Sequence, residues 1–106
     1  MTTPQFSVTC SDDERVLRVV VEGELDMATE PELVDAVRKA VLDTSATRIV
    51  LDTAGLTFVD SSGLRALLMA RDTATANDLP LTVVVVDGPV PRLFEAAGVT
   101  QWFTYE

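Results

Sequence analysis

The tetrapeptide Asp60-Ser61-Ser62-Gly63 stands between an apolar run with strand character and a leucine-rich segment with helical period, within residues 51–69. This order places a serine hydroxyl at the N-terminus of a helix. The first amides of a helix have no intrahelical acceptor and the helix dipole is positive there, so such a serine can cap the helix, react or carry a phosphate. Ser61 is therefore the residue whose chemistry has to be identified.

A serine hydrolase is excluded by the residues that its chemistry requires. A nucleophile elbow needs a glycine two residues before the serine and a histidine base elsewhere in the chain. Val59 occupies the glycine position, and the 106-residue sequence contains no histidine. The single lysine, Lys39, falls on the predicted solvent face of a helix, where its amine is too well hydrated to act as a base.

Other phosphate and metal chemistries also lack residues that they need. A receiver-domain phosphoacceptor at Asp52 would require a lysine on a late strand, and residues 81–86 contain none. A cysteine phosphatase at Cys10 is opposed by the acidic residues that follow, which raise the pKa of the thiol. Asp26, Asp52 and Asp60 would bind a hard cation only if they converged, which their spacing does not require. We expect no catalytic residue, no metal and no cofactor.

Two interpretations of Ser61 remain. Other proteins could modify it, or it could belong to a pair of residues that simply caps the helix. Either Asp60 or Ser61 would stabilise the helix by about 0.5–2 kcal/mol as its cap, and this explains the pair by itself. Gly63 argues for a further role, because glycine costs a helix roughly 0.8–1 kcal/mol relative to alanine. Its missing side chain is expected to leave the serine open to close approach.

The same helix is expected to present a docking stripe beside the serines. Leu67 marks its inward face by period. The residues that then point outward near Ser61 and Ser62 are Arg65, Met69 and Asp72. Ser62 is also a hydroxyl, and it is the alternative site of modification.

Composition predicts one soluble cytoplasmic domain over residues 1–106. The length suffices for a single core, the hydrophobic fraction of 47% is too high for a disordered chain, and no apolar run approaches the roughly 20 residues of a membrane helix. The N-terminus shows no secretory signal. The net charge of −9 disfavours nucleic acid and anionic membranes, and a partner attracted by charge should present basic residues.

The hydrophobic pattern predicts strands that alternate with helices. Strands are expected at residues 6–10, with Cys10 on the buried face, and then at 16–21, 48–52 and 81–86, the last covered on both faces. An acidic turn at 11–14 should join the first two strands. Helices are expected from a capping box formed by Thr29 and Glu32 to about Asp43, and then over 61–77 and 91–97, the last ended by Gly98.

This order, with residues 100–105 as a further edge strand, predicts an α/β fold. Because a strand-helix-strand unit pairs its strands in parallel, the sheet should be mixed, with four to five strands and three or so helices packed on one side.

Three sequence blocks resemble the anti-sigma factor antagonists of the STAS domain family. They are GELD at 23–26, LTFVDSSGLRALL at 56–68 and VPRLFEAAGV at 90–99, and their order and spacing match along essentially the whole chain. The resemblance implies a non-enzymatic protein that binds a serine kinase acting as an anti-sigma factor and so frees the sigma factor. It also implies that this kinase phosphorylates the first serine of DSSG, here Ser61, that a metal-dependent serine phosphatase restores it, and that Asp26 and Asp60 flank the site.

The predicted function is therefore transcription regulation by partner switching, with the chain acting as a monomer or weak dimer. The expected partner-binding residues are Asp26, Asp60, Ser61, Ser62, Gly63, Arg65, Met69 and Asp72. One alternative stays open, a STAS subunit of another assembly, such as a stress-signalling complex or the partner of a lipid transporter, whose serine is never modified. A small nucleotide hydrolase is disfavoured because the sequence lacks both histidine and a glycine-rich phosphate loop.

Overall fold

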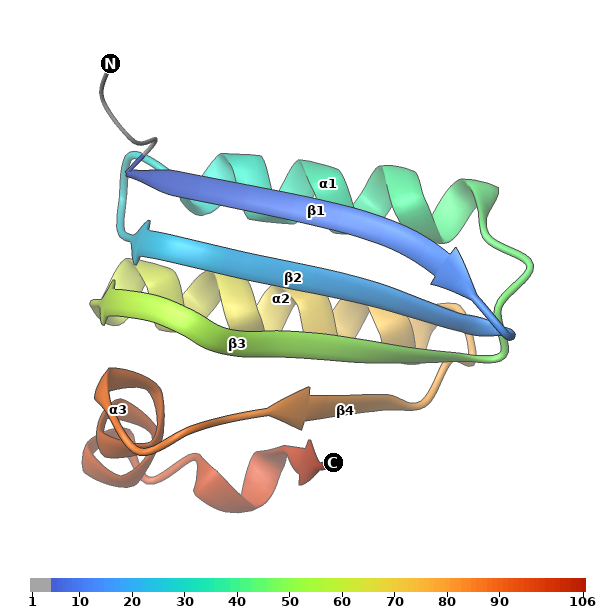
Figure 1. The fold of residues 1–106 in the computed structure, drawn as a ribbon. Helices are drawn as coiled ribbons and strands as arrows, with labels where there is room; N and C mark the ends of the chain where they lie inside the picture. The colour runs from blue at the N-terminus through green and yellow to red at the C-terminus, as the bar shows by residue number, and fades with distance from the viewer. Residues whose placement is uncertain (1–4) are drawn as a thin grey trace.

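Five strands form one mixed sheet in the computed structural model, which describes residues 5–106, so residues 1–4 of the predicted domain lie outside the described part (Figure 1). In chain order the elements are β1 (Phe6–Asp13), β2 (Val16–Leu25), α1 (Glu30–Asp43), β3 (Arg48–Val59), α2 (Ser61–Ala76), β4 (Leu81–Val84), α3 (Pro89–Ala97), the 3-10 helix η1 (Thr100–Trp102) and β5 (Thr104–Tyr105). The strands lie side by side in the order β1-β2-β3-β4-β5, antiparallel between β1 and β2 and parallel thereafter. The predicted fold class is confirmed, and so is the order of strands and helices up to α3. The predicted edge strand over 100–105 is only partly correct, because residues 100–102 form a 3-10 helix and only Thr104–Tyr105 pair with β4.

A two-residue turn joins β1 and β2. Glu14 and Arg15 both adopt the left-handed conformation, with φ of 49° and 68°, which is the backbone of a turn that matches strand twist. The prediction that residues 11–14 form the turn is wrong, since pairing continues to Asp13 opposite Val16. Acidic residues are tolerated in this strand because β1 is an edge strand and they stay exposed.

Parallel pairing brings the carboxyl ends of β2 and β3 to the same edge of the sheet. Their register runs from Val16 opposite Arg48 to Leu25 opposite Val59. Two register shifts in between, at residues 20–22 and 23–24 of β2, accommodate the two additional residues of β3. β3 therefore continues well beyond residue 52, where the sequence predicted its end. Leu25 and Val59 form the last pair, so the residues that follow them, Asp26 and Asp60, leave the sheet from adjacent strands.

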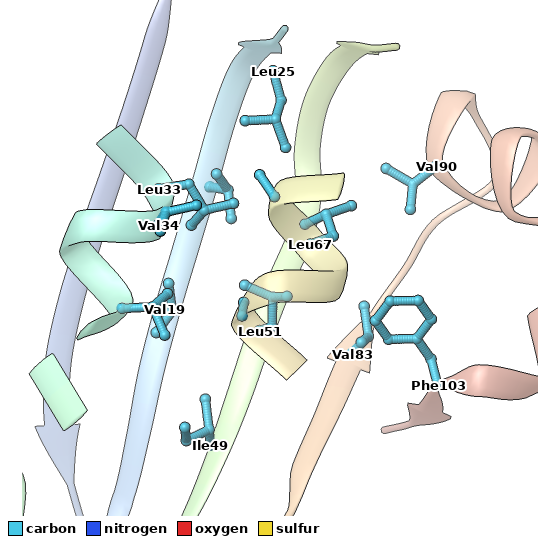
Figure 2. Close-up of a cluster of buried hydrophobic side chains, with 14 of the residues drawn as sticks. Val19, Leu25, Leu33, Val34, Ile49, Leu51, Leu67, Val83, Val90 and Phe103 are labelled. Carbon is cyan, nitrogen blue, oxygen red and sulfur yellow. The ribbon is translucent and has the colours of Figure 1, made fainter. Parts of the chain in front are cut away.

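The hydrophobic core lies between the sheet and the helices on one of its faces. Figure 2 shows Val19 and Leu51 of the sheet pointing toward Leu33 of α1 and Leu67 of α2, and all four side chains are buried. At the end of the chain, Phe103 stacks on Phe94 of α3, with ring centroids 4.5 Å apart and planes at 4°. Gly98 ends α3 in the left-handed conformation as predicted, with φ of 71°.

The opposite face of the sheet carries several polar side chains around the buried Val50, which alternates with the core residues Ile49 and Leu51. Arg48 pairs there with Glu106 at 2.6 Å, and the Thr82 hydroxyl donates to the same carboxylate at 2.8 Å. The pairing with Arg48 lowers the pKa of Glu106. Full coverage of both faces of β4 was expected and is not found, because Thr82 and Val84 are only partly buried.

Cys10 is exposed, so the prediction of a buried thiol is wrong. The prediction that Cys10 lies on the same side of β1 as Phe6 and Val8 is confirmed, because its Sγ lies 4.0 Å from the carbonyl oxygen of Ala36 in α1. The thiol stays accessible because β1 is an edge strand with little cover beyond it. Within residues 5–106, no helix combines the length and the apolar content that a bilayer crossing requires.

Candidate functional site

Asp60, not Ser61, caps helix α2. Its backbone is extended, its carboxylate accepts a hydrogen bond from the Gly63 amide at 2.9 Å, and its carbonyl accepts from the Leu64 amide at 2.8 Å. Ser61 is the first residue of the helix. The amides of Ser61 and Ser62 have no acceptor inside the helix, so they are free to bind an anion held on either hydroxyl.

The two serines differ in accessibility. Ser61 is exposed, whereas Ser62 is half-buried. Within the part of the chain that the structure describes, neither hydroxyl is engaged in a hydrogen bond to another residue. Exposure therefore favours Ser61 as the residue that an enzyme reaches, a distinction that helical spacing alone does not make.

Gly63 lies inside the protein, where the first turn of α2 crosses the end of the sheet. A Cβ atom at this position would come within 2.4 Å of the Leu25 carbonyl oxygen and 2.7 Å of the Val59 Cγ2. The glycine is needed for close packing, which is a different reason from the exposure that the sequence suggested. We therefore leave Gly63 out of the surface that a partner can contact.

Asp26 organises the turn between β2 and α1. Its carboxylate accepts from the amides of Ala28 at 2.9 Å and Thr29 at 3.1 Å. The Thr29 hydroxyl turns back toward β2, where it accepts from the Asp26 amide and donates to the Glu24 carbonyl, both at 2.9 Å. The predicted capping box is therefore wrong, because the Thr29 side chain caps no amide of α1.

The three carboxylates weighed as a cation site have separate roles. Asp26 and Asp60 accept hydrogen bonds from turn and helix amides, while Asp52 accepts from the Ala54 amide at 3.0 Å and faces Arg18 at 3.9 Å. Among residues 5–106, no three His, Cys, Asp or Glu side chains are grouped as metal ligands.

Arg65 joins the starts of the two long helices. Its Nη2 lies 2.7 Å from Oε1 of Glu30, the first residue of α1, and this hydrogen bond raises the pKa of the guanidinium. The Arg65 side chain is 70% exposed and that of Glu30 only 12%, so the carboxylate is largely enclosed by protein while the guanidinium remains accessible. Sequence reasoning placed Arg65 on the surface but missed Glu30, since the contact joins residues of different helices.

The remaining predicted surface residues divide into two cases. Asp72 is exposed and lies 3.6 Å from Arg71. Met69 is half-buried and packs against the core, so only part of its side chain can meet a partner.

Two apolar side chains at this end of the sheet were not predicted. Met27, in the turn after β2, is 77% exposed, and Phe58, opposite Glu24 near the end of β3, is 45% exposed. The sequence could have indicated them, since Met27 is an apolar residue in a loop and Phe58 one on the solvent side of a strand. Such residues are common on protein surfaces, so this pattern alone does not single them out.

Comparison with known proteins extends over nearly the whole chain. The family model described as "Mlab, STAS domain" matches residues 8–104. An anti-sigma factor antagonist from Mycobacterium paratuberculosis has 27% sequence identity and a TM-score of 0.83, over 99% of this chain and 90% of that chain.

Two structures of SpoIIAA share the fold. The anti-sigma factor antagonist SpoIIAA in its unphosphorylated form has a TM-score of 0.75 at 20% identity, over 94% of this chain and 88% of its own. The Bacillus cell fate determinant SpoIIAA in its phosphorylated form has a TM-score of 0.68 at 19% identity, over 95% and 90%. The family model matches almost every described residue, and the sheet order and the helices on one face agree with it. The chain therefore belongs to the STAS domain family.

Proposed function

We propose that this protein is an anti-sigma factor antagonist controlled by phosphorylation of Ser61. Its unmodified form binds a serine kinase that serves as an anti-sigma factor, and the bound kinase releases its sigma factor. The kinase phosphorylates Ser61, which ends the binding, and a metal-dependent serine phosphatase reverses the modification. The observation that carries the proposal is the exposed Ser61 at the first position of α2, in a chain whose whole fold is similar to anti-sigma factor antagonists.

The proposed docking surface is the carboxyl edge of β2 and β3 together with the exposed side of α2 as far as Asp72. It combines two exposed apolar side chains with charged ones, a mixture that is usual in protein interfaces. We define this serine surface by Asp26, Met27, Phe58, Asp60, Ser61, Ser62, Arg65, the exposed part of Met69, and Asp72. A partner that fits this surface has an apolar pocket surrounded by basic residues.

Phosphorylation of Ser61 would act on this surface without unfolding the helix. It adds about −1.5 to −2 charges to a chain of net charge −9, giving roughly −11. The free amides of Ser61 and Ser62 and the helix dipole stabilise an anion at this point, so α2 should stay intact. The cost then falls on the interface, where a bulky dianion would be buried beside the carboxylates of Asp26 and Asp60. A thousandfold loss of affinity needs only about 4 kcal/mol.

The test combines phosphorylation with binding. The pure protein is incubated with Mg²⁺-ATP and each candidate anti-sigma kinase of its own cell, and its intact mass is followed. We expect one phosphoryl group on the native chain and on Ser62→Ala, and none on Ser61→Ala. Calorimetric titration of the kinase should show tight binding of the native chain and Ser61→Ala, and binding weakened at least tenfold for Ser61→Glu and the phosphorylated chain.

Failure would take a distinct form for each part of the proposal. If Ser61→Glu binds like the native chain while phosphorylation still releases the kinase, charge alone is not the mechanism. If protein recovered from growing and stressed cells never carries phosphate, the switch is wrong and a STAS subunit of another assembly becomes the better description. The pure chain with Mg²⁺-ATP is expected to show no ATP turnover.

A further inference from the structure

The guanidinium of Arg65 lies within reach of any group attached to Ser61. The two residues are four positions apart in α2, a spacing that places side chains on the same face about 5–6 Å apart at Cβ. Helical side chains also lean toward the N-terminus, so Arg65 extends over the first turn. Its contact with Glu30 at the start of α1 agrees with that direction.

We propose that Arg65 is the counter-ion of phosphorylated Ser61. The guanidinium keeps Nη2 on Glu30 and turns another donor to the phosphoryl oxygens, so that one cation bridges the carboxylate of α1 and the phosphate of α2. This inference rests on the proposed function, because it concerns the state in which Ser61 carries a phosphate.

The donor count of arginine permits the bridge. A guanidinium has five N–H donors in a fixed plane, and the contact with Glu30 engages the Nη2 end of that plane. Donors on Nη1 and Nε remain for phosphate oxygens, which arginine binds with short charge-assisted hydrogen bonds.

Glu30 prepares the site before any phosphate is present. A free arginine side chain loses much of its rotamer freedom when it is ordered, and this opposes the binding of an anion. Because the Glu30 side chain is only 12% exposed, the surrounding protein restricts its carboxylate, and the contact with that carboxylate restricts the guanidinium in turn. A phosphate on Ser61 then meets a cation that is in position, and less ordering remains to be done.

The other arginine of α2 cannot take this role. Arg71 is ten residues beyond Ser61, which is about 15 Å along the helix axis, and it lies 3.6 Å from the Asp72 carboxylate. Arg71 is therefore the matched control for Arg65, with the same charge, the same helix and no access to the phosphate.

Phosphoserine incorporated at position 61 during translation allows a direct test without any kinase. The second pKa of the phosphate, about 6 for free phosphoserine, is measured by ³¹P NMR titration in four proteins: native Arg65, Arg65→Ala, Arg65→Lys and Arg71→Ala. The helix N-terminus acts equally in all of them. We expect the pKa to be higher in Arg65→Ala than in the native protein by about half a unit or more, partly restored in Arg65→Lys, and unchanged in Arg71→Ala.

The result separates this inference from the proposed function. Equal titration of the native and Arg65→Ala proteins, both shown by circular dichroism to be folded, overturns the counter-ion role. An equal shift in Arg71→Ala also overturns it, since the effect would then be long-range charge. Absence of phosphate on the protein from cells would instead overturn the proposed switch and leave the titration result standing.

Discussion

Gly63 lies against the carbonyl oxygen of Leu25, so closely that a Cβ atom on Gly63 would come within 2.4 Å of that oxygen. The contact joins the backbone of α2 to the end of β2 with no side chain between them. Since the Asp60 amide also donates to the Leu25 carbonyl, at 3.3 Å, one peptide unit of β2 fixes the start of the helix. The position of the Ser61 hydroxyl is thereby set by backbone contacts on both sides of it.

Gly63→Ala should destabilise the protein. The added methyl group meets backbone atoms that cannot move without displacing β2, so we expect the free energy of unfolding to fall by about 1–3 kcal/mol even though alanine is the better helix former. The control is Gly55→Ala, where the nearest atoms to the added Cβ belong to the exposed Glu22 side chain, which can turn away where backbone atoms cannot. Urea unfolding of both variants measures the effect, and an unchanged midpoint for Gly63→Ala would show that the contact is not tight.

Loss of the Asp60 cap should also cost stability. Asp60→Ala removes the acceptor of the Gly63 amide, and we expect about 0.5–2 kcal/mol less free energy of unfolding. Asp60→Asn keeps an acceptor oxygen and removes the charge, so it should lie close to the native protein in thermal unfolding. If both variants lose the same stability, the carboxylate charge and not the hydrogen bond supports the helix.

The sequence was a good guide to the elements that depend on local periodicity. Leu33, Val37 and Val41 recur at helical spacing and are buried in α1, and Gly98 ends α3 as its freedom at positive φ allows. The turn near Arg15 and the far end of β3 were misplaced, because both are set by pairing between strands. Cross-strand register is a tertiary property that no local window contains.

In the candidate site, too, the sequence predicted the local features but not the contacts between elements. The DSSG motif located the start of α2 and the exposed Ser61, since capping and helix start are local. It did not reveal that Gly63 is buried or that Arg65 meets Glu30, because these contacts depend on how α2 lies against β2 and α1.

The thiol of Cys10 should react slowly with alkylating reagents despite its exposure. Partial burial, and then the nearby charge of Asp12, raise its pKa, so a smaller fraction is thiolate at a given pH and the rate of reaction with iodoacetamide should rise at higher pH than for an ordinary cysteine. Asp12→Asn should lower the pKa only in part, because burial is the larger cause. Asp13→Asn, on the opposite face of β1, is the control, and an equal shift there would contradict the assignment to Asp12.

Met27 and Phe58 should carry much of the binding energy of the serine surface. Interfaces obtain most of their affinity from a few side chains that become buried at the centre, and truncation of such a residue costs more than 1 kcal/mol. Met27 and Phe58 are the two large apolar side chains of the serine surface that are well exposed and so can be buried by a partner. We expect Met27→Ala and Phe58→Ala each to weaken kinase binding about tenfold, which corresponds to roughly 1.4 kcal/mol.

A matched control for these two variants lies at the other end of α1. Leu42 is 82% exposed and is the residue before the last of that helix, so Leu42→Ala removes a well-exposed apolar side chain far from Ser61. Its kinase affinity should stay native, measured by the same titration, and urea unfolding of all three variants separates lost contact from lost stability. If Leu42→Ala weakens kinase binding as much as the other two variants, the docking surface is not at the carboxyl edge of the sheet. The three variants each delete an exposed apolar side chain, so its position is what distinguishes them.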